Sequence, residues 1–216
     1  MPRTARPKAP PPTTVLLVRH GQTPTTGSVL PGRAKGLHLA DAGKQQAEAA
    51  AKRVEGMKVA AIYASPLERT RETAAPFAAT LGLKVVPEKG LLECDFGEWT
   101  GAELKKLMKL PEWSTVQRYP SGFRFPNGES FAEMQTRMVG TIARLVEQHR
   151  GETIVCVSHA DPIKAAVAAA LGTHLDLFQR IVISPCSITA VAYATAGPIV
   201  LTVNSTSGDV GGLKPS

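Results

Sequence analysis

Three short polar segments of this sequence each follow an apolar run, and their residue types suit the binding of an anion. Arg19 and His20 follow the first run, the second segment ends at Arg69, and the third contains His159. A phosphoryl group spreads its charge over three oxygens, so its transfer needs cationic or N–H donors around it. Each arginine can offer a bidentate fork, one histidine can attack phosphorus, and the other can donate to an oxygen. The residues therefore predict phosphoryl transfer through a covalent histidine intermediate.

A leaving alkoxide also needs a proton, and an apolar stretch further along the chain offers carboxylates for this task. They are Glu93, Asp95 and Glu98. A carboxyl group enclosed by Phe96 and Trp99 would have its pKa raised by desolvation, so that it could act as an acid near neutral pH. The residue types alone leave the choice among the carboxylates open.

The elements that precede these segments must bring them together. Short, branched apolar runs predict strands over residues 14–18, 59–64, 84–86, 153–158, 187–194 and 199–203. Helices are predicted over residues 42–54, 67–81, 131–149 and 162–172, with Asp41, Ser130 and Asp161 as caps and Gly82 as a terminator. Strands that alternate with helices predict an α/β fold, a three-layer α/β/α sandwich with a mostly parallel central sheet. Because such sheets place ligand sites at the carboxyl ends of their strands, we expect the polar segments to meet at one edge.

With these segments in place, the chain resembles the histidine phosphatase superfamily, also called the phosphoglycerate mutase-like family. The resemblance runs from about Thr14 to Val203. It rests on motifs that occur in the family's order: R-H-G at 19–21, S-x-L-x-R at 65–69, L-x-E-x-x-F-G-x-W-x-G at 91–101, P-x-G-E-S at 126–130 and S-H at 158–159. The resemblance implies a phosphoglycerate mutase-like sandwich with a small lid insertion.

The resemblance also implies a role for each matching residue. His20 resembles the nucleophile that becomes phosphohistidine, and Arg19, Arg69 and His159 resemble the phosphate pocket. Glu93, in preference to Asp95 and Glu98, resembles the proton donor to the leaving group and then the base for water. The family's chemistry implies no metal and no cofactor. Further phosphate contacts are implied for Gln22, Thr23 and Ala160.

Three functions are compatible with this set of residues. The first is hydrolysis of a small phosphomonoester, the second is a phosphomutase that uses the same phosphohistidine, and the third is a non-catalytic phosphate-binding module. The third is disfavoured because every chemical group is present. In cofactor-dependent phosphoglycerate mutases an arginine follows the acid, whereas Cys94 follows Glu93 here. This departure favours a metal-independent phosphomonoesterase.

Composition and charge set the limits of the molecule. The chain has 216 residues, 43% of them hydrophobic, and a net charge of +7, which suits anionic small substrates. Basic residues are not interleaved with aromatics, so a nucleic-acid partner is not expected. No apolar run approaches a membrane span and the N-terminus has no signal h-region, so we expect no membrane partner and a cytoplasmic location. The three cysteines, which form no CxxC pair, fit reduced thiols.

We expect one folded domain over residues 13–203, with a lid formed by about residues 88–128. Residues 1–12 are rich in proline and basic residues, and residues 204–216 are rich in glycine and serine, so both are expected to be flexible tails. The sequence leaves open the physiological substrate and the oligomeric state, with a homodimer as one option.

Overall fold

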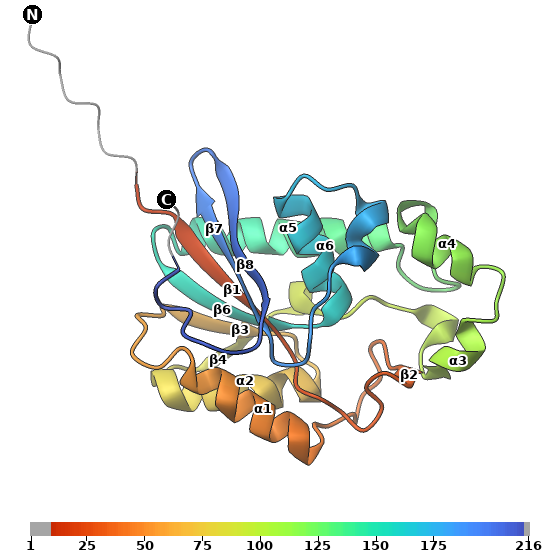
Figure 1. Ribbon diagram of the computed structural model, residues 1–216, viewed down its shortest axis with the longest axis horizontal. Coiled ribbons are helices and arrows are strands. Elements are labelled where there is room, and N and C mark those ends of the chain that lie inside the picture. Colours follow the sequence, from red (N-terminus) through yellow and green to blue (C-terminus); the bar gives the residue numbers. More distant parts are fainter. Residues whose placement is uncertain (1–9, 214–216) are drawn as a thin grey trace, which may run out of the picture.

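A six-stranded mixed sheet forms the centre of the computed structural model, which describes residues 10–213. The strand order is β4-β3-β6-β1-β7-β8, and β4, β3, β6 and β1 are parallel to one another (Figure 1). β7 runs antiparallel to β1, and β8 runs antiparallel to β7. The bounds are β1 Thr13–Arg19, β3 Ala61–Ala64, β4 Val85–Pro87, β6 Thr153–Ser158, β7 Ile188–Ala194 and β8 Gly197–Ser205.

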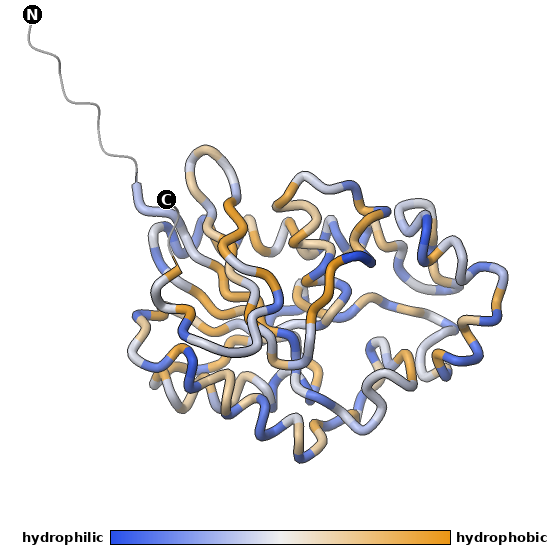
Figure 2. The backbone as a smooth tube through the Cα atoms, viewed as in Figure 1, coloured by the Kyte–Doolittle hydropathy of each residue, from blue (hydrophilic) through white to orange (hydrophobic). Residues whose placement is uncertain are grey.

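Helices cover both faces of this sheet, which confirms the predicted three-layer sandwich (Figure 1). α1 (Asp41–Lys52) and α2 (Glu68–Leu81) pack on one face, and α5 (Phe131–Gln148) and α6 (Ala160–Ala170) pack on the other. Alternate residues of β1 point to opposite faces, so Leu16 contributes to the first layer and Leu17 to the second. Figure 2 shows hydrophobic residues concentrated along the central strands.

Two helix ends follow the sequence rules directly. Gly82 ends α2 in the left-handed conformation, with φ of 66°. Ser130 begins α5 with a capping box, because its hydroxyl accepts from the Glu133 N–H at 3.1 Å and the Glu133 carboxylate accepts from the Ser130 N–H at 2.9 Å. Both predictions are confirmed.

The predicted caps of the other two helices are wrong by one or two residues. Ala40 is the N-cap of α1 and His159 is the N-cap of α6, and neither makes a side-chain cap hydrogen bond. Asp41 and Asp161 instead lie in the first turn, where a carboxylate is still favoured by the helix dipole. As the N-cap residue of α6, His159 has an extended backbone conformation.

The segment from η1 to η3 lies beside one end of the sheet and carries its own apolar core. Its elements are η1 (Lys89–Leu91), η2 (Gly97–Trp99), β5 (Ala102–Glu103), α3 (Leu104–Leu107), α4 (Trp113–Arg118) and η3 (Pro120–Gly122), and β5 pairs with β2 (Val29–Leu30). Phe125 is 1% exposed, and its ring lies 4.8–5.4 Å from the rings of Phe96, Trp99, Phe123 and Phe131. η4 (Leu175–Arg180) closes this core through Phe178. Phe96 and Trp99 are thus packing residues of this segment.

The end of the chain differs from the flexible tail expected from residue 204. β8 continues through Ser205, and Val210 is 2% exposed in the core beside α1. Arg53 donates to the carbonyls of Ser205, Ser207 and Gly208. Residues 1–9 of the expected N-terminal tail and residues 214–216 lie outside the described residues. Within residues 10–213, no helix combines the length and apolarity that a bilayer crossing requires.

Candidate active site

The polar segments that follow β1, β3 and β6 lie side by side. Arg19 is in register with Ser158, and Ala64 is in register with Val157. Beyond the strands, the His20 N–H donates to the Ser158 carbonyl at 3.0 Å, and the Ser65 N–H donates to the Val157 carbonyl at 3.0 Å. The parallel strands therefore bring His20, Ser65 and His159 to one edge of the sheet, as the sequence predicted.

His20 is held as a neutral imidazole with one free nitrogen. Its ring is buried, and Nδ1 lies 2.7 Å from the Gly21 carbonyl oxygen. A carbonyl oxygen only accepts, so Nδ1 carries the proton and Nε2 keeps its lone pair. Burial, together with the charges of Arg69 and Arg19, lowers the pKa of His20 to about 3. At neutral pH the imidazole is therefore unprotonated and Nε2 can act as a nucleophile.

His159 stands opposite His20, with ring centroids 5.2 Å apart and an angle of 63° between the planes. Its Nε2 lies 2.9 Å from the Ser65 hydroxyl oxygen. Burial, followed by the charge of Arg69, lowers the pKa of His159 well below its ordinary value. Its Nδ1 is buried and has no partner among residues 10–213.

The two arginines act electrostatically on both histidines. Arg69 is 0% exposed, and one of its terminal nitrogens donates to the Gly32 carbonyl at 2.7 Å. Arg19 donates to the Ile183 carbonyl at 2.7 Å. Burial lowers the pKa of both, but a guanidinium stays charged in proteins. Nε and Nη1 of Arg69 and Nε of Arg19 are buried without a partner in the described part of the chain.

Glu93 lies in the same electrostatic environment and is 7% exposed. Burial, reinforced by the charge of Asp161, raises its pKa to about 7, against the Cys94 N–H and the charges of Arg69 and Arg19. The Cys94 N–H donates to Oε1 at 3.0 Å. The competing carboxylates are engaged elsewhere, since Asp95 pairs with Arg33 and the exposed Glu98 accepts from Asn127. A carboxyl group that titrates near neutral pH is suited to donate and then accept a proton.

The residues expected to add phosphate contacts occupy different environments. Thr23 is buried, and its hydroxyl lies 3.0 Å from that of Thr26. Gln22 is exposed, and its N–H donates to the Gln46 side chain. Ala160 is the first residue of α6 and half-buried. Their contacts with phosphate stay predictions.

Gly21 leaves room for the close approach of a neighbouring helix. A Cβ at this position would lie 2.5 Å from the Gly43 carbonyl oxygen of α1. A Cβ on Gly43 would in turn lie 2.0 Å from the Gln22 carbonyl oxygen. The two glycines let α1 approach the end of β1 closely, and the Gly21 N–H donates to the Thr73 hydroxyl at 3.0 Å.

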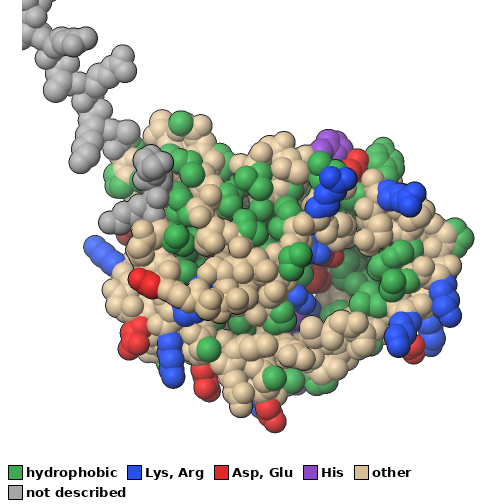
Figure 3. Space-filling view, viewed as in Figure 1, with side chains coloured by type: hydrophobic (Ala, Val, Ile, Leu, Met, Phe, Trp, Pro, Cys, Tyr) green, Lys and Arg blue, Asp and Glu red, His purple; other side chains and the backbone are tan. Residues whose placement is uncertain are grey.

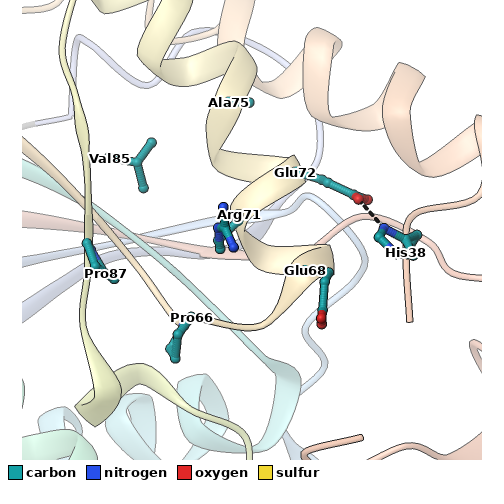
Figure 4. A pocket seen from close by; sticks show the side chains of 8 residues that line it. All are labelled: His38, Pro66, Glu68, Arg71, Glu72, Ala75, Val85 and Pro87. Carbon is teal, nitrogen blue, oxygen red and sulfur yellow. Dashed lines mark hydrogen bonds and ion pairs between the residues drawn. The ribbon is translucent and has the colours of Figure 1, made fainter. Parts of the chain in front are cut away.

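The site opens onto a hollowed face between the end of the sheet and the lid, where basic, acidic and histidine side chains are visible (Figure 3). A separate hollow of about 660 Å³ lies on the outer face of α2. Figure 4 shows that it is lined by His38, Glu68, Arg71 and Glu72 among others, and that His38 pairs with Glu72. None of the nitrogens described above belongs to that second hollow, so we place the candidate site at the sheet edge. Arg71, as expected, lies on an exposed face of the helix.

Residues 15–206 match the family model described as histidine phosphatase superfamily (branch 1). The chain belongs to this superfamily. A related protein of this superfamily, phosphoserine phosphatase 1 of Hydrogenobacter thermophilus, is 31% identical over 197 residues, which cover 89% of this chain and 92% of the relative. A probable phosphoglycerate mutase of Yersinia enterocolitica is 31% identical over 181 residues, with 83% and 84% covered.

The histidine phosphatase fold is shared with solved structures. A phosphoserine phosphatase variant of Entamoeba histolytica, solved with phosphoserine, superposes with a TM-score of 0.81 at 27% identity and covers 90% of this chain and 98% of that chain. The comparisons thus place this chain among enzymes whose names include both phosphatases and mutases.

Sequence reasoning missed two parts of this histidine phosphatase site. Ser65 belongs to a recognised motif, yet its contact with His159 was not predicted. Glu129 was given no catalytic role from the sequence, whereas its carboxylate accepts hydrogen bonds from Arg33 and Arg137. The P-x-G-E-S motif marked the position of Glu129 but not its partners.

Proposed function

We propose that this protein is a phosphatase that hydrolyses a small phosphomonoester through a phosphohistidine at His20, with Glu93 as general acid and base. The observation that carries the proposal is the set of buried nitrogens on Arg19, Arg69 and His159 that have no partner within residues 10–213. Buried donors are ordinarily paired, and an unpaired one costs about 1–3 kcal/mol. A phosphoryl group bound between them would supply oxygens to all of them at once.

In the first step, Nε2 of His20 attacks phosphorus and the bond from phosphorus to the leaving oxygen breaks. Glu93 gives its proton to that oxygen and becomes a carboxylate. The imidazolium that forms keeps its Nδ1–H on the Gly21 carbonyl. Arg19 and Arg69 stabilise the charge that develops on the phosphoryl oxygens.

In the second step, the Glu93 carboxylate accepts a proton from water while the water oxygen attacks phosphorus. The N–P bond breaks, its electron pair returns to Nε2, and inorganic phosphate leaves. Glu93 is protonated again and His20 is neutral, so the cycle closes without a metal or cofactor.

A phosphomutase is the second candidate, supported by the 31% identity to a probable phosphoglycerate mutase. The same phosphohistidine would then be attacked by a substrate hydroxyl instead of water. Hydrolysis is favoured because Cys94, and not an arginine, follows Glu93. Phosphoserine is the first substrate to test, because a phosphoserine phosphatase is 31% identical to this chain.

The test is a rapid-quench experiment with labelled phosphoserine, 3-phosphoglyceric acid and p-nitrophenyl phosphate. We expect label on His20 that is stable in base and labile in acid, followed by release of inorganic phosphate. Label recovered on another hydroxyl would instead support the mutase. His20→Ala should abolish both signals, and His38→Ala, at an exposed ring on the outer face of α2, should leave them unchanged. Phosphate release by His20→Ala within about ten-fold of the unmodified protein would overturn the proposal.

A further inference from the structure

An arginine of α5 holds the backbone that leads into Glu93. Arg137 donates to the carbonyls of Gly90 at 2.8 Å and Leu92 at 2.9 Å, and at 3.3 Å to that of Glu93 itself. Its guanidinium also pairs with both oxygens of Glu129, at 2.8 and 2.9 Å. One side chain therefore fixes the path of the segment that carries the candidate acid.

A second arginine, in the loop before α1, also contacts the Glu93 carbonyl and the Glu129 carboxylate. Nε of Arg33 donates to the Glu93 carbonyl at 2.9 Å, and a terminal nitrogen donates to Glu129 at 2.8 Å. Glu129 accepts in addition from the Asp95 N–H at 3.1 Å. Burial opposes the ionisation of Glu129, but the hydrogen bonds and charge of Arg137 lower its pKa, so the carboxylate is ionised.

The backbone that Arg33, Glu129 and Arg137 hold lies outside regular secondary structure. After η1 the chain runs from Leu92 to Phe96 outside helix and strand, so no regular hydrogen-bond ladder fixes it. Glu93 must nevertheless present its carboxyl group to a leaving oxygen within hydrogen-bond distance. Bidentate pairs between arginine and carboxylate are geometrically specific and suit this task.

We propose that Arg33, Glu129 and Arg137 form a positioning clamp that holds Glu93 at the leaving group, with Glu129 as its centre. This inference rests on the proposed function of Glu93. The three residues act through the backbone of Glu93 and are positioning residues. We name them the Glu129 clamp.

The clamp also has an electrostatic consequence. Glu129 and Asp95 balance the charges of Arg33 and Arg137. A neutral residue at position 129 would leave excess positive charge near Glu93 and favour its ionised form. Glu93 also faces Arg19, Arg69 and Asp161, which such a substitution leaves in place.

The experiment compares kcat/KM for an alkyl phosphate and for p-nitrophenyl phosphate, whose leaving group needs little protonation. For Glu129→Gln we expect a loss of up to about 100-fold on the alkyl ester and only a few-fold loss on the aryl ester. The alkaline limb of the pH profile should also move to lower pH. Glu93→Gln serves as the reference for complete loss of the acid.

Glu133→Gln is the matched control, since Glu133 is a nearby glutamate in the first turn of α5 and serves the capping box of that helix. It should lower the melting temperature while leaving the ratio of the two kcat/KM values unchanged. Arg33→Lys, which keeps the charge and loses the fork, provides a second variant should Glu129→Gln fail to fold. Arg33→Lys should also lose more kcat/KM on the alkyl ester than on the aryl ester, but the difference should be smaller than in Glu129→Gln.

The outcomes separate the two proposals. If Glu93→Gln discriminates between the esters but Glu129→Gln and Arg33→Lys lose equally on both, the clamp is overturned and the role of Glu93 stands. If Glu93→Gln itself loses equally on both esters, the assignment of Glu93 as the acid fails.

Discussion

The Ser65 hydroxyl lies 2.9 Å from Nε2 of His159, which leaves Nδ1 as the ring nitrogen without a partner among residues 10–213. A hydroxyl that donates to Nε2 leaves the proton of the neutral imidazole on Nδ1. In that tautomer the Nδ1–H, which has no partner among residues 10–213, is free to donate to a phosphoryl oxygen. The strand end of β3 thus orients a histidine at the strand end of β6.

Replacing Ser65 tests this relationship. We expect Ser65→Ala to lower kcat/KM about ten-fold, because the loss of a buried hydrogen bond that orients a catalytic group costs about 1–2 kcal/mol. The measurement is steady-state kinetics together with nitrogen NMR of the ring tautomer. Ser114→Ala, at an exposed position of α4, is the control. Unchanged kinetics with an unchanged tautomer would show that Ser65 does not orient the ring.

The pH dependence of the reaction follows from two groups shifted in opposite directions. His20 must be unprotonated to attack, so the rate should rise as pH passes about 3. Glu93 must be protonated to donate, so kcat/KM for an alkyl phosphate should fall as pH rises through about 7. In Glu93→Gln, the part of this fall in kcat/KM that is due to ionisation of the enzyme should disappear. A fall that persists unchanged in this variant would be due to ionisation of the substrate.

The unpartnered nitrogens predict that phosphate stabilises the protein. Phosphate at 100 times its dissociation constant should add about 2.7 kcal/mol to the free energy of unfolding, which corresponds to a rise of about 5–10 °C in melting temperature. Arg69→Ala should lose most of this rise, whereas Arg71→Ala, on the exposed face of the same helix, should keep it. Thermal melts with and without phosphate measure both. Equal rises in the two variants would contradict the assigned phosphate pocket.

The close approach of α1 to the end of β1 predicts a stability effect that the motif alone does not. Gly21→Ala places a Cβ against the Gly43 backbone, which cannot relieve the clash by changing rotamer as a side chain can. We expect a loss of about 1–3 kcal/mol, measured by urea denaturation. Gly140→Ala is the opposite case, since nothing lies within 4 Å of its Cβ on an exposed turn of α5. It should stabilise by about 0.5–1 kcal/mol.

Much of the candidate site can be predicted from the sequence because the carboxyl ends of adjacent parallel strands lie together. His20, Ser65 and His159 are far apart along the chain, but each follows a strand, and adjacent parallel strands end at one edge. Gly82 and Ser130 were equally predictable, because helix ends depend on contacts within a few residues. The pattern of apolar residues then fixes which face of each element is buried.

Other features needed the tertiary structure, because they join residues that no local rule connects. Arg33 and Glu129 are 96 positions apart, and only the folded chain brings them together at the carbonyl of Glu93. Lys164 of α6 is half-buried and donates to Asp161 and to Gln179, which lies 15 positions further along the chain. The sequence by itself thus determined which residues meet at the sheet edge, through strand ends and motifs. The tertiary structure alone decided how that chemistry is held, because long-range hydrogen bonds and close backbone contacts leave no periodic trace in the sequence.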